Sequence, residues 1–238
     1  MATFLLVHGA WHGAWCWDRL AQRLRAAGHG VLAPDLPAHG QDRTPWWRAS
    51  LAGYAQRVCD AARPAGRVIA VGHSLGGLVI TEASVREPAL FAGLVYLCAF
   101  APLRGESLMS LGRSDAGTLV PVAARWGFGT ISIRPERATA AFYDGCAPAD
   151  AAAATARLCP TPIRPVFQGV SAAAGRGLPL AYVECTEDRA ITIGLQRRMH
   201  RRLPMQRVVT MEADHSPFLG APDALAEHLD ALAGIAAG

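Results

Sequence analysis

Two amino acids are missing from this sequence of 238 residues, which contains neither lysine nor asparagine. All 23 basic residues are therefore arginines. Without lysine, the chain cannot form a Ser–Lys catalytic dyad, a Schiff base or the phosphate-binding loop of P-loop NTPases. Without asparagine, it carries no site for N-glycosylation. Because the codons for both residues are AT-rich, we expect a GC-rich and bacterial genome.

Long hydrophobic runs and cysteine motifs are also missing. The apolar N-terminal stretch is short and has no basic segment before it, so we expect a cytoplasmic protein with no signal peptide and no membrane partner. The six cysteines form no C-x-x-C pair, which favours reduced core residues over disulfides or a metal site. The net charge of +4 is scattered, and the arginines at 197–202 fit a solvated helix face, so we expect no nucleic-acid partner.

Strand and helix patterns alternate along much of the chain. Apolar and β-branched runs predict strands at 3–7, 30–35, 67–72, within 91–100, 178–185 and 206–212. Helical patterns fall at 17–27, 50–62, after residue 74, 192–202 and 222–236. This alternation predicts an α/β fold, with a sheet of about six mostly parallel strands and helices on both faces. The functional site of such a sheet lies at the carboxyl ends of its strands.

Residues 101–177 interrupt this alternation. They contain seven prolines and short Ala-rich helical pieces, and a structureless loop of this length is unusual in a compact domain. We therefore predict a mostly helical cap at 101–177, inserted into a core formed by 1–100 and 178–238. Two aromatic residues of the cap, Trp126 and Phe128, are candidates for the wall of a substrate pocket.

The stretch VIAVGHSLGGLVI, residues 68–80, places one serine between two apolar segments. Gly72, Ser74 and Gly76 form the motif G-x-S-x-G, in which the serine occupies a strained turn between a strand and a helix and keeps its Oγ exposed. Glycines are needed there because a Cβ would strike a neighbouring element. We predict that Ser74 is a nucleophile and that the N–H of Leu75 points at the group it attacks. The alternative is a glycine-rich turn whose serine only caps the helix.

A serine nucleophile needs a base and an acid. His215 directly follows the last predicted strand, and we predict that it is the base. Asp188 follows the preceding strand, and we predict that it orients the imidazole. Glu187 and Glu184 remain alternatives for the acid. Asp214 is the sequence neighbour of the histidine, so its carboxylate cannot easily reach the far ring nitrogen.

The segment after the first strand should lie beside the serine turn. Gly9 lets the backbone approach a ligand there, and the N–H of Ala10 is the candidate second oxyanion donor, paired with that of Leu75. The alternative is an ordinary turn from a strand into a loop. We also expect an apolar pocket, in which the side chains that contact the substrate, besides the two cap aromatics, are Trp11, His12 and Phe218.

Several stretches together resemble the α/β-hydrolases, and within them the branch of plant methylesterases and hydroxynitrile lyases with their bacterial esterase relatives. These stretches are FLLVHGAWHGAWCW, GHGVLAPDLPAHG, GHSLGG, EDRAI and ADH, and they extend along nearly the whole chain. The resemblance implies a triad of Ser74, Asp188 and His215. It also implies an oxyanion hole made of the backbone N–H groups of Ala10 and Leu75, and catalysis without a cofactor.

The resemblance covers two chemistries, and the sequence favours one of them. Lyases of this branch resemble H-T-x-x-H-G where this chain has Gly9, and they carry a lysine after the catalytic histidine where this chain has Ser216. We therefore predict a serine carboxylesterase that acts on a small-molecule ester through an acyl-enzyme, with neither cofactor nor metal. The alternatives are a hydroxynitrile lyase-like or C–C bond-cleaving enzyme, a thioesterase or cyclase in a biosynthetic pathway, and a receptor-like hydrolase that binds a ligand. A homodimer stays open because members of this family often pair.

Overall fold

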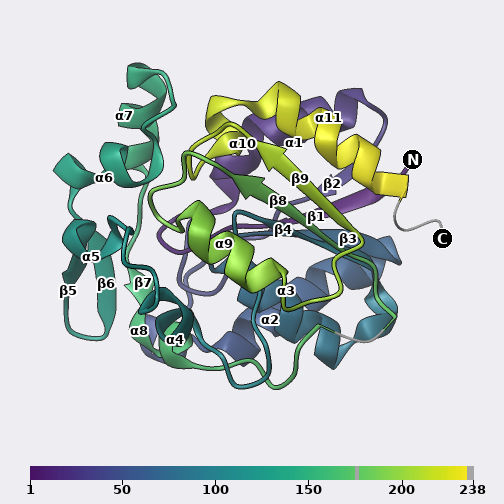
Figure 1. Cartoon of the computed structure of the whole chain (residues 1–238). Coiled ribbons are helices and arrows are strands. Elements are labelled where there is room, and N and C mark those ends of the chain that lie inside the picture. The colour runs from purple at the N-terminus through teal and green to yellow at the C-terminus, as the bar shows by residue number, and fades with distance from the viewer. Residues whose placement is uncertain (175–176, 235–238) are drawn as a thin grey trace.

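Six strands form one parallel sheet in the computed structural model, which describes residues 1–174 and 177–234 (Figure 1). The strand order is β2-β1-β3-β4-β8-β9, and every neighbouring pair runs parallel. The α/β architecture and the six-stranded sheet predicted from the sequence are confirmed. The strands are β1 (Thr3–Val7), β2 (Gly30–Leu32), β3 (Val68–His73), β4 (Phe91–Leu97), β8 (Leu180–Cys185) and β9 (Arg207–Met211).

The sheet lies between two apolar layers. In β1, Leu5 and Val7 belong to one buried cluster, whereas Phe4 and Leu6 belong to the other. This division arises because successive residues of a strand point to opposite faces of the sheet. All six positions of β3 are buried, which explains why its sequence shows no polar alternation.

Helices cover both faces of the sheet (Figure 1). One face carries α1 (Asp18–Ala26), α10 (Pro217–Gly220) and α11 (Pro222–Ala233). The opposite face carries α2 (Leu51–Ala62), α3 (Gly76–Arg86) and α9 (Ile193–His200). Short 3₁₀ turns are η1 (Ala14–Trp17), η2 (Trp46–Arg48), η3 (Arg63–Ala65) and η4 (Pro88–Leu90). Across the described ranges, no helix is both long enough and apolar enough to cross a membrane.

Two predicted segments extend into residues that the structure does not describe. The closing helix was expected at 222–236, and its last two positions lie outside the described residues. Residues 175–176 of the expected cap lie outside them as well.

The inserted segment after β4 contains more than helices. Its helices are α4 (Leu108–Gly112), α5 (Val120–Ala123), α6 (Pro135–Phe142), α7 (Pro148–Ala156) and α8 (Ile163–Phe167). The expectation of a mostly helical cap did not include a three-stranded antiparallel sheet, formed by β5 (Ala124–Trp126), β6 (Thr130–Ile133) and β7 (Thr161–Pro162). Gly129, at φ +76°, permits the tight turn between β5 and β6, and the β-branched residues of β6 favour a strand.

The turn between β3 and α3 requires glycine because neighbouring backbone lies very close. A Cβ on Gly76 would lie 2.4 Å from the carbonyl oxygen of Val7, and one on Gly77 would lie 2.2 Å from that of Phe100. A Cβ on Gly72 would come within 2.6 Å of the Gly76 oxygen. Any larger residue at these positions would push α3 away from the sheet.

Replacing Gly76 with alanine should therefore destabilise the protein. The added methyl group must displace backbone rather than a flexible side chain, so we expect the free energy of unfolding to fall by about 1–3 kcal/mol. Gly234→Ala is the matched control, because no described atom lies within 4 Å of its Cβ position. Urea denaturation measures both variants, and equal stabilities would contradict the close-packing argument.

Candidate active site

Ser74 occupies the turn between β3 and α3 in a left-handed backbone conformation, with φ at +53°. Such a conformation is strained for a residue other than glycine, and strain of this kind is concentrated at functional sites. The N–H groups of Gly77 and Phe100 both donate to the Ser74 carbonyl, each at 3.1 Å. Ser74 is largely buried but lines a cavity. The predicted nucleophile is thus held in a fixed turn at a cavity wall.

His215 and Asp188 form a buried pair beside the same cavity. His215 lies on the loop between β9 and α10, and its Nδ1–H donates to Asp188 Oδ2 at 2.8 Å. Because Nδ1 carries this proton, Nε2 is the unprotonated nitrogen of the neutral ring. His215 and Ser74 both line the cavity. The structure therefore brings together the three residues that the sequence predicts as nucleophile, base and acid.

Backbone donors orient the Asp188 carboxylate. Its Oδ1 accepts hydrogen bonds from the N–H groups of Ala190 at 2.7 Å and Ile191 at 2.8 Å, which leaves Oδ2 facing the imidazole. The two alternative acids are placed elsewhere: Glu184 forms ion pairs with α9, and Glu187 is exposed. Geometry therefore selects Asp188 among the three carboxylates.

Gln196 supports this acid, although no sequence motif marks it. Its Oε1 accepts from the N–H of Cys185 at 3.0 Å, and its Nε2 donates to the carbonyl oxygen of Ile191 at 2.7 Å. The same Nε2 lies 3.3 Å from Asp188 Oδ2. The side chain is fully buried. A lone glutamine on a helix normally faces solvent, so only the tertiary structure reveals this role.

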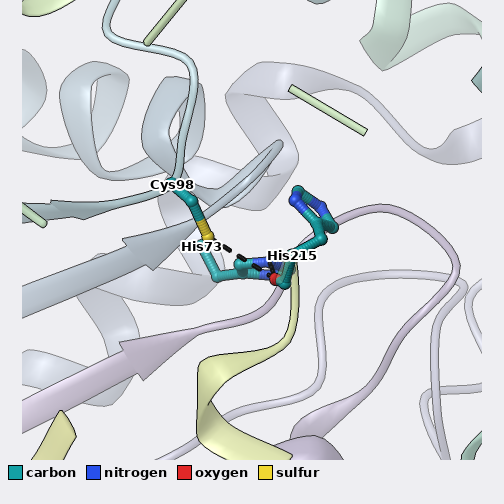
Figure 2. Close-up of side chains that lie close together, drawn as sticks. All are labelled: His73, Cys98 and His215. Atoms are coloured by element: carbon teal, nitrogen blue, oxygen red, sulfur yellow. Dashed lines mark hydrogen bonds between the residues drawn. The ribbon is translucent and has the colours of Figure 1, made fainter. Parts of the chain in front are cut away.

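Two further side chains anchor the backbone of His215 (Figure 2). His73 Nε2–H donates to the His215 carbonyl at 2.8 Å, and the Cys98 thiol donates to the same oxygen at 3.5 Å. Both side chains are fully buried. His73 ends β3 and Cys98 directly follows β4, so two strand ends fix the main chain that carries the imidazole.

His73, Cys98 and His215 also form a candidate metal site, because each places one potential ligand atom within 4.8 Å of the others. Burial raises the pKa of the Cys98 thiol well above its usual value, whereas a metal ligand must be a thiolate. His73 Nε2 is occupied by the carbonyl, and His215 Nδ1 by Asp188. The donor set therefore fits a hydrogen-bonded anchor better than a metal centre.

The candidate oxyanion donors flank Ser74. Leu75 is the N-cap of α3, where the helix dipole favours negative charge. Within residues 1–174 and 177–234, neither its N–H nor that of Ala10 has a hydrogen-bond partner. A Cβ on Gly9 would lie 2.8 Å from the Cβ of Ser74, so the backbone before Ala10 passes against the serine. Both N–H groups are thus available near the nucleophile.

A mostly apolar cavity of about 230 Å³ opens beside Ser74. Of the predicted pocket residues, Trp11 and Trp126 line it, and Arg113 and Asp115 bring charged groups to its wall. Its apolar lining includes Ala10, Phe100, Leu108, Met109, Val120, Ile131, Phe142, Val166, Ala190, Ile191 and Leu195. The core and the inserted segment therefore share this wall.

Trp11 joins the core to the inserted segment. Its backbone N–H donates to Thr161 Oγ1 at 2.7 Å, and its indole Nε1–H donates to the carbonyl oxygen of Ile131 at 2.9 Å. Trp11 has a left-handed backbone, with φ at +63°. These bonds hold one wall of the cavity in place.

Two residues predicted to contact the substrate lie away from the cavity wall. Phe128 stands at the tip of the β5–β6 hairpin and is almost fully exposed, because the turn directs it outward. Phe218 is buried beneath the site, where its ring lies 5.0 Å from the rings of both Trp17 and His73. For these two residues, the expectation of substrate contact is corrected.

His12 is a third correction. It is buried outside the cavity wall, and its Nδ1–H donates to the carbonyl oxygen of Ala10 at 2.8 Å. The hydroxyl of Tyr143 donates to its Nε2, also at 2.8 Å. His12 thus connects the candidate oxyanion segment to the inserted segment from behind.

Four buried histidines around the turn are held neutral. Burial lowers the pKa of His12 and His39 to about 4, and it lowers the pKa of His8 and His73 well below the usual value. A neutral ring can donate at one nitrogen and accept at the other. His8, for example, donates to the carbonyl of Gly9 and accepts from a backbone N–H in the next loop.

Three comparisons identify relatives of the chain. The model of the Alpha/beta hydrolase family matches residues 4–228. A carbendazim hydrolyzing esterase from Nocardioides is 45% identical over 47% of each chain, and methyl jasmonate esterase 1 from Vitis vinifera is 30% identical over 96% of this chain and 95% of its own. The crystal structure of a pyrethroid hydrolase from Sphingobium faniae has a TM-score of 0.84 at 26% identity and covers 98% of this chain and 97% of that one. The resemblance and the α/β-hydrolase fold predicted from the sequence are confirmed.

The buried histidines should make the protein less stable in mild acid. In the unfolded chain a histidine binds its proton near its ordinary pKa of 6.5, whereas folded His39 does so only at about 4. The unfolded state therefore binds more protons between these values, so stability is complete above pH 6.5 and declines toward pH 4. His39→Gln should make this decline shallower by about 1.4 kcal/mol per pH unit.

Urea denaturation between pH 4 and pH 6.5 measures how steeply the free energy of unfolding falls with pH. His228→Gln, at a half-exposed position of α11, controls for the loss of an imidazole. A slope that is the same for wild type and His39→Gln would show that this histidine contributes nothing to the decline.

Proposed function

This chain belongs to the alpha/beta hydrolase family, and we propose that it is a serine carboxylesterase. One observation carries the proposal: His215, which is hydrogen-bonded to buried Asp188, lines the same cavity as Ser74. Acyl transfer through a serine requires this set of residues, and their order along the chain is the one typical of this fold. The relatives are named as esterases and hydrolases, which supports ester hydrolysis as the class of reaction.

Ser74, His215 and Asp188 each have a separate role in the reaction. Ser74 Oγ attacks the carbonyl carbon of the ester while His215 Nε2 takes the hydroxyl proton. The histidine returns this proton to the departing alcohol, which leaves the acyl group on the serine. A water molecule, deprotonated by the same nitrogen, then releases the acid. Asp188 keeps the imidazole in the required tautomer and stabilises its cation in each step.

Backbone donors stabilise the charge that develops on the substrate. The carbonyl oxygen becomes negative in the tetrahedral intermediate, and the N–H groups of Ala10 and Leu75 donate to it. The start of α3 adds the positive end of its helix dipole. Gly9 allows the Ala10 segment to lie against Ser74, since a side chain there would collide with the serine.

The cavity defines the class of ester. A volume of about 230 Å³ with a mostly apolar wall suits a compact, uncharged acyl or alcohol part. The relatives' names refer to carbendazim, methyl jasmonate and pyrethroids, which are chemically diverse. They support an apolar small-molecule ester as substrate without selecting one.

The lyase alternative finds less support at this site. A Cβ at position 9 would lie 2.8 Å from the Cβ of Ser74 and 3.0 Å from His73 Nδ1, so a threonine at Gly9 has no room. Ser216, which stands in place of the lyase lysine, is fully buried. Thioesterase, cyclase and receptor-like functions would use the same residues, and no feature of the described structure favours them over the esterase.

The first test is the release of p-nitrophenol from acetate, butyrate and octanoate esters. Wild type should turn over, and Ser74→Ala should lower kcat/KM by about three orders of magnitude or more, because only oxyanion-hole catalysis remains. The order of the three esters reports how deep the acyl part enters the cavity. Folded wild-type protein that hydrolyses none of them would overturn the esterase proposal for these acyl groups.

Asp188 and Asp214 offer a matched pair of buried carboxylates near His215. Asp188→Asn should lower kcat by about 10⁴ because an amide favours the wrong imidazole tautomer. Asp214 instead accepts from the N–H groups of Gly145 at 2.9 Å and Ser216 at 2.8 Å. These two bonds go to different carboxylate oxygens, so an asparagine oxygen can keep only one of them. Because neither bond holds the imidazole, Asp214→Asn should still lower kcat less than about tenfold. Comparable losses in the two variants would contradict the role of Asp188.

A further inference from the structure

Most of the large apolar side chains that the described residues expose gather around one hairpin. Phe128, at the tip of the β5–β6 hairpin, is 93% exposed, and Trp126 on β5 is 53% exposed. Trp47 in η2 is 61% exposed, and Phe167 at the end of α8 is 48% exposed. A gathering of exposed apolar side chains of this size on a folded protein marks a site of interaction.

Ring contacts link these side chains in two groups. The ring of Trp46 lies 5.6 Å from that of Trp47 and 5.9 Å from that of Phe128, and the ring of Trp126 lies 6.3 Å from that of Phe167. Trp126 and Phe128 are two residues apart on the hairpin, so the hairpin carries one member of each group. Figure 1 shows this hairpin at the outer edge of the molecule, away from both termini. We call these five residues the aromatic face.

The segments that carry the aromatic face are strongly basic. Residues 43–48, 124–134 and 161–168 contain five arginines and no aspartate or glutamate, whereas the whole chain has a net charge of only +4. The rest of the chain is therefore close to neutral. All five arginines are exposed, and none forms an ion pair within the described part of the chain; they are Arg43, Arg48, Arg125, Arg134 and Arg164.

We propose that the aromatic face docks on the surface of an anionic lipid bilayer. Tryptophan and phenylalanine rings enter the interfacial layer of a membrane, and arginines beside them are attracted to acidic headgroups. Arg48 directly follows Trp47, and Arg164 lies one helical turn before Phe167. Aromatic rings and positive charges therefore lie side by side. Insertion of the rings and attraction to acidic headgroups act together, as stable peripheral membrane binding requires.

A second copy of this chain fits the face less well. A two-fold interface places the same surface against itself, which would bring the unpaired arginines of both copies together without any acidic group in these segments. A lipid surface supplies the missing negative charge. The sequence-based expectation of no membrane partner rests on the lack of a spanning segment, and surface docking requires no such segment.

The aromatic face also borders the cavity. Trp126 belongs to both, and Ile131 and Val166, from the same basic segments, line the cavity wall. Docking would bring the cavity to the lipid surface, where apolar esters are concentrated. This consequence rests on the proposed esterase function, but lipid binding does not. Vesicle binding and ester hydrolysis are therefore measured separately.

The test is co-sedimentation of the full chain with vesicles of mixed phosphatidylglycerol and phosphatidylcholine, compared with vesicles of phosphatidylcholine alone. We expect binding to the anionic vesicles, weakened by high salt because salt screens the headgroup charge. Arg48→Ala should lower the partition coefficient about fivefold. Phe128→Ser should lower it about tenfold, because a large ring no longer leaves water.

Two controls remove similar side chains elsewhere on the surface. Val208→Ser replaces an exposed apolar residue of β9, and Arg201→Ala replaces an exposed arginine after α9. Both should bind vesicles as wild type does. Circular dichroism confirms that all variants are folded, and their rates on soluble p-nitrophenyl acetate should match wild type if that ester is hydrolysed.

Two results would overturn the proposal. The first is no binding to anionic vesicles, or equal binding by Phe128→Ser, Arg48→Ala and the two controls. The second is a wild-type dimer in sedimentation equilibrium that Phe128→Ser converts to a monomer, which would assign the face to a second copy. Neither result depends on whether the protein hydrolyses esters.

Discussion

The site depends on how closely the turn between β3 and α3 approaches the neighbouring backbone. The carbonyl oxygens of Val7 and Phe100 occupy the space that Cβ atoms on Gly76 and Gly77 would need. Ser74 takes its left-handed conformation in the same turn. Since α3 cannot shift without opening these contacts, the hydroxyl stays at the carboxyl edge of the sheet. A polar group can thus sit between two buried segments because packing fixes the turn that carries it.

Buried side chains fix the position of His215, the proposed base, relative to this turn. His73, the residue before Ser74, donates to the carbonyl of His215, so the proposed nucleophile and the proposed base are linked through two short stretches of backbone. Asp188 holds the ring, and Gln196 ties that carboxylate to α9. The anchors come from β3, the loop after β8 and α9, so the sheet and a helix packed on it together maintain the geometry. The anchoring histidine is neutral, which fits its burial, because an unpaired charge there would be costly.

The sequence predicts those parts of this arrangement that follow from the periodicity of strands and helices and from the order of residues along the chain. Ser74, Asp188 and His215 each follow a strand, and parallel strands bring their carboxyl ends to one edge. Gln196 and Phe218 could not be placed, because the side of a helix that meets the sheet depends on its rotation in the folded protein. The sequence does not predict the β5–β6 hairpin. Its strands have only three and four residues, which is too few to show a recognisable alternating pattern among prolines and alanines. Composition marks Phe128 as apolar but does not say whether its turn points inward.

The outward position of Phe128 is a consequence of a packed turn. A Cβ on Gly129 would lie 2.0 Å from the indole of Trp46, so the hairpin tip rests tightly on η2. Leaving a phenylalanine in water forgoes about 1.5–3 kcal/mol of burial free energy. The isolated chain does not recover this energy, because the same packing that shapes the tip directs the ring away from the cavity. A lipid surface facing the basic segments would recover it, and would place the cavity beside the phase in which apolar esters dissolve. Lipid docking through the hairpin would then determine where the proposed esterase works, and the cavity behind the hairpin would determine which ester it cleaves.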